Sequence, residues 1–348
     1  MAVFVALGYI TVGVRFAIIT ALLLLFIGAC GIWSQSMITL SSVLVSVAVS
    51  SAVGPTSCPG RRKPSSGNCY AVCGIFLALT LLLGSLNLVQ YSGWWPGFLD
   101  RNLLKTLHLQ MGLLGWIGFL IFGVGFHVIP MFYLLSKPFS DKQARGILLT
   151  AFGSLSALST GSILGMSKDW LLLFSLPGLA SVFYFSYTLL RMLYQRKRKV
   201  HDSTLRLWQG GILALCLSLP LGLSHLVSPG QQWLFLFGIF FIGGFAISVS
   251  IGMLYKIVPF LIWFHRFSSL IGQIRVPLLK DLLPKRLPAI QAFLHGVSLL
   301  LVCSGIFLQE DLSIRIGAGL WMVSSLMLLI HLIFVVSHKP KIPAPHLG

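Results

Sequence analysis

Six histidines lie in or at the ends of long apolar segments, where a polar side chain is costly and is expected to face other protein. They are His108, His127, His225, His265, His295 and His331. An imidazole is a common axial ligand of heme iron and also binds other metals or moves protons. The histidines are therefore the first candidates for chemistry in this sequence.

His108 has the most suggestive neighbours. Gly112 and Gly115 follow it on the same face of a helix. An imidazole beside two glycines leaves a shallow groove that a flat macrocycle can approach, so this face predicts a heme site with His108 as the iron ligand. The alternative is that the glycines allow close helix packing while His108 bonds to a neighbouring backbone group.

The other histidines are secondary candidates. His225 ends a predicted helix after Pro220 and Gly222, and it is either a second heme ligand, a pocket residue or a solvated helix end. His265 is expected at the membrane interface. His295 and His331 are expected to pair across the last two helices in a structural role. His127 is too far along its helix to share a metal with His108.

Other catalytic chemistry has little support. All seven acidic residues fall in predicted loops, so no predicted span carries a carboxylate for ion coupling or acid–base work. The six cysteines show no CxxC pair and no spacing typical of a zinc site. No Ser-His-Asp set or phosphate-binding loop is recognised. We predict no catalytic residue.

The elements that position the histidines are transmembrane helices. Hydrophobic residues make up 56% of the 348 residues and charged residues 9%, whereas a soluble chain is about a quarter charged. Several apolar runs exceed the roughly 20 residues that cross a bilayer. The fold class is all-α, a polytopic bundle of about ten transmembrane helices. The predicted spans are 8–30, 36–54, 70–93, 108–135, 146–166, 170–191, 206–226, 232–264, 288–309 and 315–337.

The net charge of +18 is explained by topology. Nineteen Lys and Arg residues fall in loops of one predicted side and four in loops of the other. Basic loops stay on the cytoplasmic side. We therefore expect both termini in the cytoplasm, a bacterial-type inner membrane as the location, and no nucleic-acid partner.

One helix is duplicated. Gly115, Gly123 and Pro130 are repeated 129 positions later as Gly244, Gly252 and Pro259, each Pro after a β-branched pair. The copies fall on the fourth and eighth spans and so run in the same direction. The single transmembrane domain 1–348 is therefore predicted to contain leading helices in 1–54, then parallel four-helix units in 70–191 and 206–337. Lys256 replaces His127 in the second copy and is expected to reach the inner surface.

The duplicated helix resembles a known family. It runs from His108 through Leu114-Gly115-Trp116 and Phe122-Gly123 to Val128-Ile129-Pro130. This order is similar to the catalytic subunit of heme-copper oxidases, especially the C-type, and to NnrS-type membrane heme proteins. The resemblance implies that His108 binds a heme and that the position of Gln110 holds a ligand of a second heme.

The sequence also departs from that family. Gln110 replaces a histidine, no histidine precedes residue 108, and the His-Pro and His-His motifs of a copper site are missing. Oxygen reduction is therefore not expected. The first hypothesis is an oxidase-like membrane protein that binds one heme, with His108, His225, Gln110, Gly112 and Gly115 around it. It would serve electron transfer, gas or redox response, or a respiratory complex, with that complex or a small redox protein as partner. The alternative is a heme-free membrane carrier or assembly partner.

Overall fold

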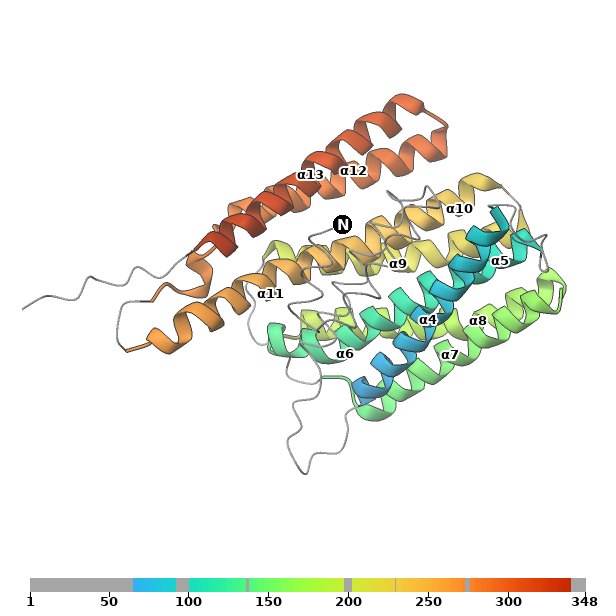
Figure 1. Cartoon of the computed structure of the whole chain (residues 1–348), viewed down its shortest axis with the longest axis horizontal. Coiled ribbons are helices and arrows are strands. Elements are labelled where there is room, and N and C mark those ends of the chain that lie inside the picture. The colour runs from blue at the N-terminus through green and yellow to red at the C-terminus, as the bar shows by residue number, and fades with distance from the viewer. Residues whose placement is uncertain are drawn as a thin grey trace, which may run out of the picture.

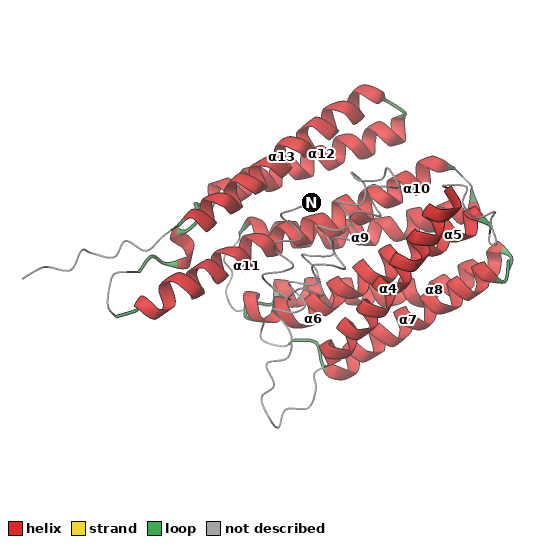
Figure 2. Cartoon of the chain, in the orientation of Figure 1, coloured by secondary structure: helices red, strands yellow, loops and turns green. Residues whose placement is uncertain are grey.

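A computed structural model describes residues 65–91, 100–135, 138–196, 202–228, 230–272 and 276–338. Only the backbone is described for residues 65–71, His127 and Lys280. These residues form helices joined by short loops, without β-strands (Figure 2). The helices are α4 (Ser65–Tyr91), α5 (Arg101–Leu109), η1 (Gln110–Gly118), α6 (Phe119–Tyr133), α7 (Asp141–Ile163), α8 (Lys168–Tyr194), α9 (Ser203–Val227), α10 (Gln231–Gly238), η2 (Ile239–Ile247), α11 (Ser248–Phe267), η3 (Ser268–Leu270), η4 (Leu279–Asp281), α12 (Arg286–Leu308) and α13 (Asp311–Ser337).

Eight helices in the described part of the chain are long and apolar enough to cross a membrane. They correspond to eight of the ten predicted spans, and the all-α fold class is confirmed. The other two predicted spans, 8–30 and 36–54, lie outside the described residues. Two membrane-length helices are composite: α5, η1 and α6 run on as one helix, as do α10, η2, α11 and η3.

Polar side chains define several helix starts. The Asp100 carboxylate accepts the backbone N–H of Leu103, so α5 begins seven residues before the predicted span. Ser140 and Gln143 form a reciprocal capping box at the start of α7. Asp202 caps α9 by accepting the N–H of Leu205. The predicted boundaries rest on hydropathy alone, which does not register these polar first turns.

The two composite helices share an unusual feature. Each contains a nine-residue π-helix, η1 at Gln110–Gly118 and η2 at Ile239–Ile247. The π-helices begin 129 positions apart, which is also the spacing of the sequence repeat. A π-helix is rare and is frequently found at functional sites. Both copies of the duplicated sequence therefore have the same local distortion.

The composite helices lie in the interior of the bundle (Figure 1). Helix α4 packs on α5, η1 and α6, while α7 and α8 form a hairpin beside them. Helix α9 packs along η2 and α11, and the α12–α13 hairpin covers another side of η2 and α11. In the most apolar part of each helix, 76% of the residues of α5–α6 and 56% of those of α10–α11 are buried, against 17% for α4 and α13. The duplicated helices are thus the inner ones.

Aromatic side chains fill the core beside α6. Phe122 and Phe185 have ring centroids 4.5 Å apart, and Phe185 stacks on Phe139 at 5.7 Å. Gly125 gives Phe185 room, because a Cβ at Gly125 would lie 2.7 Å from the Phe185 ring. This cluster joins α6 to α8.

Candidate functional site

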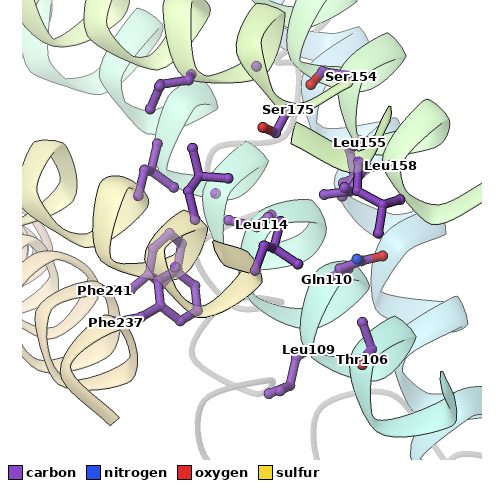
Figure 3. Close-up of a pocket in the computed structure, with 18 of the residues that line it drawn as sticks. Thr106, Leu109, Gln110, Leu114, Ser154, Leu155, Leu158, Ser175, Phe237 and Phe241 are labelled. Atoms are coloured by element: carbon purple, nitrogen blue, oxygen red, sulfur yellow. The ribbon is translucent and has the colours of Figure 1, made fainter. Parts of the chain in front are cut away.

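A cavity of about 540 Å³ lies between the helices from α5 to α8 and the helices from α9 to η2. Its walls come from α5, η1 and the start of α6 on one side and from α9, α10 and η2 on the other, with α7 and α8 completing it. Figure 3 shows Phe237 and Phe241 facing Gln110, Leu155 and Leu158 across it. The volume falls within the roughly 300–1,000 Å³ of small-molecule sites.

Most of the wall is apolar. Phe119, Phe122, Phe241 and Phe245 line it together with many leucines. Ser154 and Ser175 also line it, but their hydroxyls donate to the carbonyls of Phe174 and Leu172. Those hydroxyls are therefore already engaged, and this part of the cavity suits a hydrocarbon.

Most other polar lining residues lie at the start of α5, at the start of η1, at the end of α7 and near the end of α9. Gln110 is the first residue of η1, and its Oε1 accepts the hydroxyl of Ser159 at 2.9 Å. The Gln110 Nε2 lies 3.4 Å from the Ser162 oxygen. These serines of α7 hold the Gln110 amide in one orientation.

His225 lines the cavity near the end of α9. Its Nδ1 is 3.2 Å from the carbonyl oxygen of Gly230, which precedes α10. A carbonyl only accepts, so Nδ1 is the donor and Nε2 of the neutral ring is an acceptor. Asp100 and Asn102 also line this end, and among the described lining residues only Asp100 and His225 are ionisable.

His108 lies away from this cavity. Its Nδ1 is 3.0 Å from the carbonyl oxygen of Thr80, and its ring packs on Gly84 of α4. A Cβ at Gly112 would lie 3.1 Å from Thr80, and one at Gly115 would lie 2.7 Å from Phe76. The face with the two glycines is thus filled by side chains of α4. This arrangement matches the packing alternative, and it does not fit a macrocycle held by His108.

The secondary histidines are dispersed. His295 bonds to Ser248 and His331 bonds to Tyr255, both at 2.9 Å. The expected pairing of His295 with His331 is therefore wrong: each ties the α12–α13 hairpin to α11, because the hairpin places both rings toward α11. His265 bonds to the carbonyl of Leu261 in its own helix, and its side chain is exposed. The side chain of His127 lies outside the described part.

Sequence reasoning placed Gln110 and His225 in the site but missed their partners. Ser159 and Ser162 belong to a Ser- and Gly-rich stretch within an otherwise apolar span, and this stretch is the signal that could have identified them. Among the described residues, no three His, Cys, Asp or Glu side chains form a group suited to a metal ion. In comparisons with known proteins, no family model and no curated protein matches this sequence.

Proposed function

We propose that this protein is a multi-pass membrane protein that binds a small, mostly apolar molecule in the cavity between its two π-helices. The observation that carries the proposal is the position of this cavity. Its lining includes Gln110 and Leu114 of η1 and Phe241 and Phe245 of η2. A largely apolar cavity with a few convergent polar groups is typical of a ligand site, and π-helices are frequent at such sites.

The proposal includes an orientation. The excess of basic residues on one side of the predicted spans supports a bacterial-type inner membrane with both termini in the cytoplasm. In that orientation the polar end of the cavity faces outward. The apolar segments 8–30 and 36–54 bring the proposed number of spans to ten. The equal spacing of the π-helices and the sequence repeat supports 70–191 and 206–337 as parallel four-helix units.

A glycine in the wall provides the test. Gly118 lines the cavity, and a Cβ there would meet only the carbonyl oxygen of Leu113, at 3.5 Å. The Cβ of a leucine at this position therefore fits beside the backbone, and Gly118→Leu should place an apolar side chain in the cavity. Gly153 is an exposed glycine of α7 with open space around it, so Gly153→Leu is the matched control.

The measurement is mass spectrometry of small molecules extracted from the purified protein. We expect one compound at near-stoichiometric amount in the wild type and in Gly153→Leu, and its loss in Gly118→Leu. Equal amounts in all three proteins, or no such compound in any of them, would contradict the proposal.

A heme in this cavity is the second candidate, supported by His225 and by the resemblance to heme-copper oxidases. The Nδ1 bond of His225 to Gly230 leaves Nε2 as the free ring nitrogen, the usual state of a ligating imidazole. A heme bound there would supply electron transfer or gas binding, and respiratory-complex subunits or a small redox protein would be its partners.

The reduced-minus-oxidised visible spectrum of the purified protein tests this second candidate. Heme bands that disappear in His225→Ala and remain in His108→Ala would support it. Bands that disappear in His108→Ala would contradict a heme in the cavity, and so would a wild-type protein without heme.

A further inference from the structure

The charges around the cavity restrict what can enter it. No Lys or Arg occurs among the described lining residues, and the carboxylate of Asp100 lies at the polar end. Nearby Arg101 and Lys105 face the ring of Tyr91 instead, at 5.8 and 5.4 Å from its centroid. An anionic head group would therefore find no counter-charge in the described lining, which is costly away from water.

A cationic head group is also disfavoured. Asp100 is exposed, and its carboxylate is engaged in capping α5. Deeper in the cavity the described lining holds no carboxylate that can pair with a buried cation. A buried unpaired charge costs far more than a buried hydroxyl. The ligand that satisfies this lining is therefore neutral.

Gln110 offers a donor to such a ligand. Its Oε1 is occupied by the Ser159 hydroxyl, and one amide N–H is directed to Ser162. The Ser162 hydroxyl itself donates to the carbonyl of Leu158, so its oxygen accepts from Gln110. The second N–H of the amide remains for a ligand.

His225 offers an acceptor. Because its Nδ1 donates to Gly230, Nε2 of the neutral ring carries a lone pair, and His225 lines the same cavity as Gln110. A hydroxyl group both donates and accepts, so it can satisfy the second N–H of Gln110 and it can satisfy Nε2 of His225. A ketone, an ether or a hydrocarbon lacks the donor that His225 requires.

We infer that the cavity binds a neutral amphiphile with a hydroxyl head group, for which Gln110 supplies a donor and His225 an acceptor, while the chain lies among Phe119, Phe241 and Phe245. This inference rests on the proposed function, since it names the chemical class of the ligand for that cavity. A long-chain alcohol, an isoprenoid alcohol and a phenol share this chemistry.

Photolabelling tests the inference. The probes are a long-chain primary alcohol with a diazirine near its tail, the matched carboxylic acid in its ionised form, the matched quaternary amine and the matched hydrocarbon. The protein is the full chain in bilayer discs of zwitterionic lipid, and labelled peptides are identified by mass spectrometry. We expect the alcohol to label the α7 and η2 walls, and unlabelled alcohol, but not fatty acid, to displace it.

The variants distinguish a loss of head-group binding from a loss of the binding cavity. Gln110→Leu and His225→Phe should each lower alcohol labelling by about tenfold, the loss of one buried hydrogen bond, without changing the low labelling by hydrocarbon. Labelling by the acid or the amine equal to that by the alcohol would overturn the head-group inference but keep the cavity as a site. No labelling of the cavity by any probe, with Gly118→Leu no different from wild type, would overturn the proposed function as well. The displacement experiment on the wild-type protein decides the head-group question even where a variant fails to fold.

Discussion

The Nζ atom of Lys256 lies 2.5 Å from Oδ2 of Asp202, which joins α11 to the cap of α9. Both side chains are 24% exposed. Thr204 donates its hydroxyl to the same carboxylate and bonds to the Tyr133 hydroxyl at 2.8 Å, while the Lys256 ammonium lies 5.3 Å from the centre of the Tyr133 ring. Lys256 is therefore held by a charge partner, where the sequence predicted only that it reaches the inner surface. The cluster connects α6, α9 and α11.

Removing either charge of this pair should destabilise the bundle. Asp202→Asn keeps an oxygen that caps α9, so it removes mainly the charge. We expect Asp202→Asn and Lys256→Met each to reduce the free energy of unfolding by about 1–3 kcal/mol, because each leaves a half-buried charge without its partner. Thermal unfolding in detergent measures this loss. The double variant should cost less than the sum of the two, and strict additivity would contradict the coupling.

The same pair predicts a dependence of stability on pH. Burial alone would raise the pKa of Asp202, but the hydrogen bond and charge of Lys256, with the bonds from Thr204 and Leu205, hold that pKa below its usual value. The unfolded carboxyl titrates near pH 4, so the stabilisation is complete above about pH 4 and is lost as the pH falls through the lower folded pKa. The stability difference between wild type and Asp202→Asn should therefore be constant above about pH 4 and should shrink as the pH falls below that value. A difference that also stays constant at lower pH would contradict this assignment.

Two glycines of α13 provide a matched test of the hairpin. A Cβ at Gly317 would lie 2.9 Å from the Val302 backbone nitrogen and 3.0 Å from the Ser298 carbonyl oxygen, whereas a Cβ at Gly319 would meet nothing. Gly317→Ala should therefore separate α12 from α13 and lower the unfolding temperature. Gly319→Ala should be neutral or raise it slightly, because alanine favours a helix by up to about 1 kcal/mol over glycine. Equal effects of the two substitutions would count against the close approach of these helices.

His108 should behave as a packing residue. His108→Ala removes the bond to the Thr80 carbonyl and leaves space beside Gly84. We expect a loss of about 1–3 kcal/mol in unfolding free energy and no change in photolabelling of the cavity by the alcohol probe. Reduced labelling with unchanged stability would instead place His108 in the ligand site.

The amino-acid pattern was sufficient to predict the helices. Apolar runs of membrane length and the repeat at 129 positions are local properties, and eight of the predicted spans are helices in the described part. The boundaries differ by up to seven residues, since caps such as Asp100 extend a helix beyond its apolar part.

Only the tertiary structure decides which helix faces contact one another. The spacing of His108, Gly112 and Gly115 defines a face, but it is equally suited to a flat ligand and to another helix, and α4 occupies it with Thr80 and Phe76. The cavity combines Gln110 with His225, residues more than a hundred positions apart whose helices are brought together by packing. Hydropathy and periodicity are properties of a single segment. They indicate which side of a helix is apolar, but they do not indicate which other helix that side contacts. A binding site arises from the gaps that remain when several helices pack, and these depend on side-chain shapes across the whole bundle.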